Sequence, residues 1–332
     1  DEMVALDKYF SREQQELSRL SIGEHPRLIR GVAGSGKTVV AEYAMLLAVA
    51  HHCQAVIMAP TDVLARQHYR TMQEDLRQSR VRIELLTGSL TAAQKQRLRE
   101  SVRSGMVDLV IGTQALLHEN LEFPKLGLVV IDEQHKFGVR QRAQLKTSGG
   151  GPHYLVMTAT PIPRTITMSL FGDLDLSTLR QSPPGRQKVH TYLGDAEQRE
   201  QWWEFFRNKL RQGRQGYVIT PRVEGTDEDD LANVEEEYER LVNGPLEAFR
   251  LGMILGRMSP EEKDTVMDDF RRGEIQVLVS TSVVEVGVDV PGATLMTIES
   301  GERFGLAQLH QLRGRISRGR FPGFCAVFAD PE

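Results

Sequence analysis

The stretch LIRGVAGSGKT, residues 28–38, decides the fold class expected for the first half of the chain. Its apolar beginning predicts a strand ending at Gly31, and GKT completes the phosphate-loop pattern GxxxxGK[ST] where a helix is expected to begin. Glycines let successive backbone N–H groups point inward, and the N-terminal end of a helix attracts anions. The stretch therefore predicts a polyphosphate cradle made by Gly31, Gly34, Ser35, Gly36, Lys37 and Thr38.

Two acids after another apolar run complete a nucleoside triphosphate site. Asp132 and Glu133 directly follow LGLVVI, where a buried strand is expected to end. Lys37 is expected to reach the β and γ phosphates of ATP. Thr38 and Asp132 are expected to hold Mg²⁺, and Glu133 to position and polarise the attacking water. The second acid favours hydrolysis over phosphoryl transfer to a metabolite.

Continuous apolar runs alternate with helical patterns along the whole chain. The runs at residues 55–59, 126–131 and 154–157 lack the alternation of half-exposed strands, so they predict an α/β fold with mainly parallel sheets flanked by helices. Two prolines and a glycine in QSPPGRQ, residues 181–187, interrupt this pattern. We therefore expect two tandem α/β domains, residues 1–180 and 188–332, joined by a linker at 181–187.

Composition excludes several classes of protein. The 332 residues are 40% hydrophobic and 26% charged, which is typical of a globular protein. The longest apolar stretch, residues 39–50, contains Glu42 and is too short and too polar to span a bilayer. Cys53 and Cys325 are the only cysteines and fit no metal or disulfide framework. We expect a cytoplasmic monomer without a membrane partner.

The net charge of −4 argues at first against a nucleic-acid partner, because phosphate contacts need lysine and arginine. However, nine acids lie between Glu224 and Glu239 with no basic residue among them, and the rest of the chain is mildly basic. This stretch is expected to be a solvated loop and helix face, or alternatively a contact for a basic partner. The total charge therefore says little about the binding face.

The second half lacks a phosphate loop but carries Gln311, Arg315 and Arg318 near its end. An arginine that stabilises a transferring phosphoryl group is worth about 10³ to 10⁵ in rate. We therefore expect Arg315 and Arg318 to act as arginine fingers on the ATP of the first domain. The alternative is a basic surface at the end of a helix.

Together these segments resemble the two RecA-like motor domains of superfamily-two helicases. The resemblance rests on GVAGSGKT (31–38), APTDVLARQH (59–68), TGS (87–89), GTQALL (112–117), DEQH (132–135), TATPIPR (158–164), STSVVEVGVDVPGA (280–293) and QLHQLRGRISRG (308–319). Moreover, IDEQHKFGVRQR, MTATPIPRT, SPPGR and ERFGLAQLHQLRGR resemble the RecG-type DNA helicases, which remodel stalled replication forks. The related transcription-repair coupling translocases more usually have DEEH and lack PPGR.

The resemblance implies ATP and Mg²⁺ as cofactors and DNA, forked or duplex, as partner. It places Gln311 near the γ-phosphate and Gly287 and Asp289 near the nucleotide. The residues implied to couple hydrolysis to DNA are His135, Thr158 and Thr160. The residues implied to grip the nucleic-acid backbone are Pro60, Thr61, Arg66, Thr87, Gly88, Thr113 and Thr281. Amide and hydroxyl donors can grip phosphates beside cations, so a near-neutral chain is compatible with DNA binding.

The chain departs from the RecG-type pattern in three ways. Ser317 stands where glycine is usual, which is expected to shift the finger loop, and Val32-Ala33 replaces the commoner Asp-Val without expected effect. RecG-type proteins also carry an N-terminal wedge domain and a C-terminal extension that this sequence lacks. We therefore expect ATP binding to survive and fork remodelling to be weak or lost.

Two other functions remain open at this stage. One is an RNA helicase, because the motif skeleton is shared and no residue visibly reads a 2′-hydroxyl. The other is a nucleotide-gated clamp that binds nucleic acid without moving. Glu133, Arg315 and Arg318 argue against the clamp, because a clamp could dispense with hydrolysis.

Overall fold

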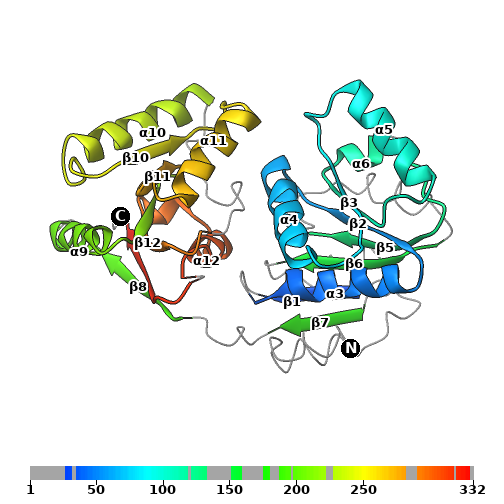
Figure 1. Ribbon diagram of the computed structural model, residues 1–332. Coiled ribbons are helices and arrows are strands. Elements are labelled where there is room, and N and C mark those ends of the chain that lie inside the picture. Colours follow the sequence, from blue (N-terminus) through cyan, green and yellow to red (C-terminus); the bar gives the residue numbers. More distant parts are fainter. Residues whose placement is uncertain are drawn as a thin grey trace. The chain divides into compact units, whose positions relative to one another are not determined.

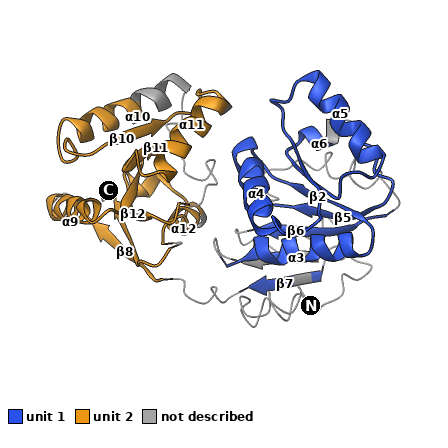
Figure 2. Cartoon of the chain, in the orientation of Figure 1, with its two compact units in different colours: residues 1–184 blue, residues 185–332 orange. Residues whose placement is uncertain are grey.

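The protein consists of two compact units, residues 1–184 and 185–332, which are drawn in different colours in Figure 2. The computed structural model describes residues 27–31, 35–118, 121–132, 151–158, 175–179, 187–195, 197–221, 227–281, 290–317 and 319–329. Each unit is built on one parallel sheet with helices beside it (Figure 1). The predicted α/β class with parallel sheets is therefore confirmed.

The first unit has a seven-stranded sheet. In spatial order its strands are β3 (Ile83–Leu86), β4 (Leu109–Gly112), β2 (Gln54–Met58), β5 (Leu126–Ile131), β6 (His153–Thr158), β1 (Arg27–Gly31) and β7 (Asp175–Leu179). All pairs are parallel, so the carboxyl ends of the strands meet at one edge of the sheet. The described helices are α3 (Lys37–Ala50), α4 (Asp62–Asp75), α5 (Ala92–Arg103) and the short α6 (Ala115–His118).

Successive residues of the central strands face opposite sides of this sheet, and both sides are covered. Ala55 and Ile57 of β2 pack with Met45 of α3 and Ala65 of α4 in one apolar cluster. Their neighbours in β2, together with Leu98 of α5, belong to a second cluster. A strand buried on both faces needs apolar side chains at every position, which explains its continuous apolar sequence.

The second unit has a six-stranded parallel sheet. Its order is β10 (Leu251–Ile254), β11 (Val277–Ser280), β9 (Gln215–Ile219), β12 (Ala293–Ile298), β13 (Gly323–Phe328) and β8 (Val189–Gly194). The accompanying helices are α9 (Arg199–Arg211), α10 (Asp227–Val242), α11 (Pro260–Arg271) and α12 (Leu306–Arg313), with a 3-10 turn at Gly301–Arg303. Trp202, Trp203 and Phe206 of α9 supply much of its aromatic core.

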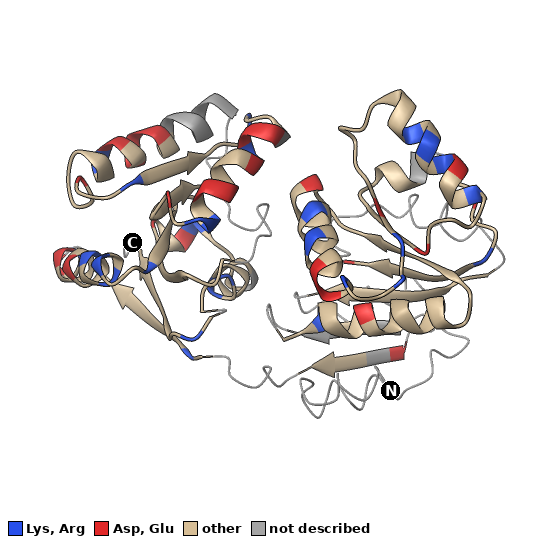
Figure 3. Cartoon of the chain, in the orientation of Figure 1, with Lys and Arg blue, Asp and Glu red and all other residues tan. Residues whose placement is uncertain are grey.

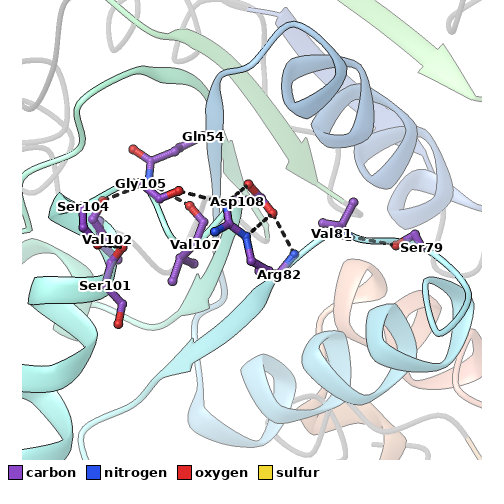
Figure 4. Close-up of polar contacts among 10 residues, drawn as sticks. All are labelled: Gln54, Ser79, Val81, Arg82, Ser101, Val102, Ser104, Gly105, Val107 and Asp108. Carbon is purple, nitrogen blue, oxygen red and sulfur yellow. Dashed lines mark hydrogen bonds and ion pairs between the residues drawn. The ribbon is translucent and has the colours of Figure 1, made fainter.

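Polar contacts join the amino-terminal ends of strands β2, β3 and β4, as Figure 4 shows. The Gln54 amide nitrogen donates to the backbone carbonyls of Val102, at 3.1 Å, and Val107, at 2.8 Å. The Arg82 guanidinium bonds both carboxylate oxygens of Asp108, at 3.0 and 2.8 Å. We call this arrangement the strand clamp. It lies at the opposite edge of the sheet from the strand ends that carry the sequence motifs.

The second unit contains a similar clamp, in which, among the described residues, the arginine bonds backbone carbonyls and no carboxylate. Gln215 donates to the carbonyls of Phe270 and Ile275, and Arg250 donates to those of Gly273 and Glu274. Helices α5 and α11 also begin with matching capping boxes. From β3 to β4 and from β10 to β11 the equivalent positions differ by 168, as for 82 and 250, 91 and 259, and 105 and 273, whereas Gln54 and Gln215 differ by 161. The two units are thus structural copies over this region, with β3, β4 and α5 matching β10, β11 and α11.

Strands β7 and β8 and the short helix α6 go beyond the elements expected from the sequence. Strands β7 and β8 lie at the edges of their sheets, and four consecutive residues of β8 are exposed. The described part of the acidic stretch forms α10, on which Glu236 and Glu239 are exposed while Val234 is buried. In Figure 3, segments of this helix are coloured red for Asp and Glu. The expected solvated helix face is confirmed there, and residues 222–226 lie outside the described residues.

Within the described residues, every helix is too short or too polar to cross a membrane.

Candidate nucleotide site and nucleic-acid interface

The phosphate loop leads into α3 with the geometry of an anion-binding turn. Gly36 has φ 82°, a left-handed conformation that glycine adopts at low cost, and it caps α3 without any side-chain cap. The first turn of α3 contains no acid and begins instead with the buried Lys37. A cation at this end opposes the helix dipole, so the arrangement suits a bound anion rather than helix stability.

Asp132 is held at the end of β5, two strands away from the phosphate loop. Its backbone N–H donates to the carbonyl of Met58 at 2.9 Å, and its carboxylate Oδ2 lies 2.9 Å from Nε2 of His68. Strand β6 separates β5 from β1, which places the two strand ends about 10 Å apart by ordinary strand spacing. A phosphate with its cation fits that interval.

The residues present fit Mg²⁺ bound together with a nucleotide. Among the described residues, no three His, Cys, Asp or Glu side chains are grouped so that they could hold a metal by themselves. Mg²⁺ usually keeps several waters and takes one or two carboxylates plus substrate phosphates. One buried carboxylate, Asp132, and the half-buried Thr38 match that donor set.

The predicted backbone-gripping residues of the first unit gather at the ends of β2, β3 and β4. Thr61 caps α4 and accepts a hydrogen bond from the Leu64 N–H at 3.3 Å. Arg66 donates from Nη2 to Ser89 Oγ at 2.8 Å, and Ser89 in turn lies 2.9 Å from Thr87 Oγ1. Three polar side chains are therefore joined into one group.

Neighbouring positions complete this group. A side-chain carbon on Gly88 would meet nothing within 4 Å, so a ligand backbone can approach there. Pro60 follows β2, and the buried Thr113 follows β4, with its N–H donating to the Leu86 carbonyl at 3.3 Å. The structure thus brings Pro60, Thr61, Arg66, Thr87, Gly88 and Thr113 to one edge of one sheet.

The sequence motifs gave no role to His68 and Ser89. His68 is buried against Asp132, and Ser89 joins Arg66 to Thr87. Both residues stand at the ends of segments quoted for the helicase resemblance, APTDVLARQH and TGS. Their places within these two segments are the sequence feature from which a role could have been predicted for them.

In the second unit, Thr281 follows β11 as Thr113 follows β4 in the first unit. Gln311, on α12, and Arg315, just after it, are both half-buried. The remaining predicted site residues, Gly34, Glu133, His135, Thr160, Gly287, Asp289 and Arg318, lie outside the described residues. Gly31 is the last residue of β1 and Thr158 the last residue of β6, where it is buried.

Ser317 adopts a backbone conformation that favours glycine. Its φ is 64°, and its hydroxyl lies 2.9 Å from the carbonyl of Phe321 and 3.3 Å from that of Gln187. A left-handed conformation costs a residue with a side chain about 1–2 kcal/mol. The hydrogen bond of the buried hydroxyl offsets this cost, which explains how serine occupies the position.

We expect Ser317→Ala to be less stable than Ser317→Gly by about 1–2 kcal/mol, because alanine keeps the backbone strain while both variants lose the hydroxyl. Urea unfolding of the two variants and the parent measures this difference. An alanine variant as stable as the glycine variant would contradict the account of strain.

A buried acid on α3 makes stability depend on pH. Burial, together with repulsion from Asp75, raises the pKa of Glu42 from its ordinary value of 4.5 to about 7. Between these values the folded protein holds a proton that the unfolded chain has released, so stability falls as pH rises from 4.5 to 7. Above pH 7 the full penalty is about 3 kcal/mol.

We therefore expect Glu42→Gln to raise the free energy of unfolding at pH 8 by up to about 3 kcal/mol, with little change at pH 4.5. Denaturant unfolding at both pH values measures the effect. Asp75→Asn is the matched control, because it removes only the smaller, electrostatic cause and should give a smaller gain. A gain from Glu42→Gln that is equal at both pH values would refute the assignment.

Two family models match the chain in succession. The DEAD/DEAH box helicase model matches residues 11–169, and the helicase conserved C-terminal domain model matches residues 197–320. The two models match in the order of the two compact units, with one model on each unit.

Curated relatives and solved structures show which kind of helicase the chain resembles. The chain is 46% identical over 306 residues to the ATP-dependent DNA helicase RecG of Synechocystis sp., and 44% identical over 316 residues to that of Thermotoga maritima. A structure of RecG bound to a three-way DNA junction matches the whole chain with a TM-score of 0.79 and 39% identity. Over nearly all of its own length, the chain is therefore similar to RecG helicases.

The chain spans less than half of these relatives. It covers 37% of the Synechocystis protein, 40% of the Thermotoga protein and 45% of the chain in the junction complex, while 92%, 95% and 100% of its own length is matched. A structure of S. cerevisiae Dbp5 bound to RNA and ADP BeF3 also matches, with a TM-score of 0.72 and 18% identity. That likeness shows a shared fold alone.

Proposed function

We propose that this chain is the motor of an ATP-dependent DNA helicase or translocase that acts on branched or duplex DNA, in fork reversal, recombination and repair. The observation that carries the proposal is the match of the whole chain, at 39% identity, to RecG bound to a three-way DNA junction. The names of the curated relatives support the same activity.

ATP and Mg²⁺ are the proposed cofactors. The phosphate loop, from Gly31 to Thr38, would bind the phosphates, with Lys37 as the principal cation and Asp132 and Thr38 as metal ligands. When bound, Mg²⁺ supplies charge neutralisation between the β and γ phosphates. The left-handed Gly36 and the acid-free first turn of α3 support this assignment. Glu133 would orient and polarise the attacking water.

In the proposed mechanism, residues 1–180 and 188–332 are the two RecA-like domains and 181–187 is their linker. Gln311, Arg315 and Arg318 would act on the phosphoryl group as it is transferred, and Gly287 and Asp289 would lie near the nucleotide. His135, Thr158 and Thr160 would couple hydrolysis to DNA movement. Hydroxyl, amide and guanidinium donors from Pro60 to Thr113, with Thr281 in the second unit, would hold the DNA backbone.

The experiment that tests this function is the steady-state ATPase rate without nucleic acid and with single-stranded DNA, duplex DNA, a model fork and structured RNA. The greatest stimulation is expected with the fork or duplex. Stimulation by RNA alone would replace the proposal with an RNA helicase. In a pure clamp, both the parent and Glu133→Gln would show little turnover with any of these nucleic acids.

We propose that the protein works as a monomer in the cytoplasm. The two cysteines, Cys53 and Cys325, are free thiols, as expected in a reducing compartment. Sedimentation of the purified chain with and without DNA measures its oligomeric state, and a stable dimer without DNA would contradict the proposal.

A further inference from the structure

His68 and Asp132 form a buried polar pair between two neighbouring elements. The Nε2 atom of His68 lies 2.9 Å from Oδ2 of Asp132, and the two side chains are 6% and 11% exposed. An ionised carboxylate only accepts hydrogen bonds, so the imidazole Nε2–H is the donor. His68 comes from α4, which follows β2, and Asp132 follows β5, the strand beside β2.

This hydrogen bond crosses a boundary in the sheet. Strands β5 and β1 lead to proposed nucleotide residues, and β6, between them, ends in Thr158, which is proposed to couple hydrolysis to DNA. Strands β3, β4 and β2 lead to the proposed DNA-gripping residues. The two groups of strands meet between β2 and β5. His68 therefore reaches from an element of the gripping half to the proposed metal ligand of the nucleotide half.

The opposite side of α4 is bonded to the gripping residues. Arg66 precedes His68 by two positions, which turns its side chain by about 200° around a helix. It donates to Ser89 at 2.8 Å, and Ser89 lies 2.9 Å from Thr87. One helix thus holds Asp132 from one side and the Thr87–Ser89 pair from the other.

In the second unit, the acid at the equivalent strand end has different partners. Glu299 follows β12 as Asp132 follows β5, and its N–H donates to the carbonyl of Ile219, the last residue of the neighbouring β9. Arg199 contacts both of its carboxylate oxygens at 2.7 Å, and Arg240 of α10 lies 3.5 Å from one of them. Arg240 also pairs with Glu237 at 2.6 Å, so Arg199 is the nearer cation of Glu299, whereas Asp132 is bonded to an imidazole.

We propose that His68 is a positioning residue that orients Asp132 for its metal and ties this carboxylate to α4, so that DNA held at the gripping residues changes metal–nucleotide affinity. The proposal rests on the proposed function, because it takes Asp132 as a metal ligand and Arg66 and Thr87 as DNA contacts. Partners that orient a metal ligand typically contribute 10- to 100-fold to metal affinity.

The first test measures metal binding directly. Mn²⁺ replaces Mg²⁺, and electron paramagnetic resonance counts the Mn²⁺ bound with ADP to the parent and to variants. His68→Leu is expected to weaken Mn²⁺ binding about 10- to 100-fold, because leucine cannot donate. His68→Gln, whose amide nitrogen can donate to the same oxygen, is expected to stay within a few-fold of the parent.

A matched control separates positioning from stability. Met72 lies one turn after His68 on the same face of α4 and is buried in the core. Met72→Val should lower the melting temperature and leave Mn²⁺ affinity at the parent value. The proposal is wrong if His68→Leu binds Mn²⁺ like the parent, or if Met72→Val weakens it equally.

The second test repeats the titration with duplex or forked DNA present. In the parent, DNA is expected to tighten Mn²⁺ and ADP binding, and linkage requires an equal effect in the reverse direction. This tightening should be lost in His68→Leu, and also in Arg66→Ala at the other side of α4. Tightening that persists in His68→Leu would overturn the α4 link alone. If DNA leaves the parent unaffected, both this link and the DNA-coupled function are refuted.

Discussion

Replacing Lys37 by alanine is expected to remove measurable ATP binding and to lower kcat/KM by about 10³, because a single preorganised donor to transferring phosphate is worth about that much. Lys37 is buried at the first position of α3, a place where a cation opposes the helix dipole. The helix dipole therefore does not account for its charge, which is consistent with the proposed role of Lys37 at the phosphates.

The charge–dipole interaction at Lys37 determines the sign of the expected stability change. Without nucleotide, Lys37→Ala should be as stable as the parent or more stable by about 0.3–1 kcal/mol, because an unfavourable charge–dipole interaction is removed. Binding of a fluorescent ATP analogue and thermal unfolding measure the two effects on one sample. A variant that lost stability together with binding would point to a structural role for Lys37.

Replacing Arg315 or Arg318 by alanine is expected to lower ATP turnover by about 10³ to 10⁵, while ATP affinity changes only a few-fold. The reason is that an arginine acting on the phosphoryl group gains its interaction mainly in the transition state, so its loss affects kcat more than binding. Single-turnover hydrolysis and equilibrium binding of a nonhydrolysable analogue separate these quantities.

Arg320→Ala provides the control for this pair. Arg320 is exposed in the same segment and has no proposed role at the phosphate, so its loss should leave turnover near the parent value. If Arg315→Ala and Arg318→Ala lost ATP affinity as completely as Lys37→Ala, the arginine-finger proposal would be wrong.

The central strands were predictable because both of their faces are buried, so that apolar residues follow one another without alternation. Strands β2, β5 and β6 are covered on both faces, and each appears in the sequence as an unbroken apolar run. Edge strands carry a weaker signal. Strand β8 exposes His190, Thr191, Tyr192 and Leu193, and β7 mixes polar and apolar residues, so neither formed such a run.

The sequence predicted the separate motifs of the candidate site but not the contacts between them. The phosphate loop and Asp132 could be recognised by their local sequence, since each depends on one strand end. The contact between His68 and Asp132 joins positions 64 residues apart and depends on β2 and β5 being neighbours, which local patterns do not specify. By contrast, similar residues recur 168 positions apart between the β3–β4 region and the β10–β11 region, and this recurrence was present in the sequence and could have indicated the equivalence of the two regions.

The paired strand clamps have a consequence for how such a protein can diversify. In each unit, glutamine and arginine fix the strands at their amino-terminal ends by bonding mostly to backbone carbonyls, which every sequence supplies. Substitutions at the opposite ends therefore leave strand register intact. One scaffold can therefore carry an aspartate bonded to histidine in one unit and a glutamate bonded to arginine in the other, so that the two units can take different roles within one polypeptide.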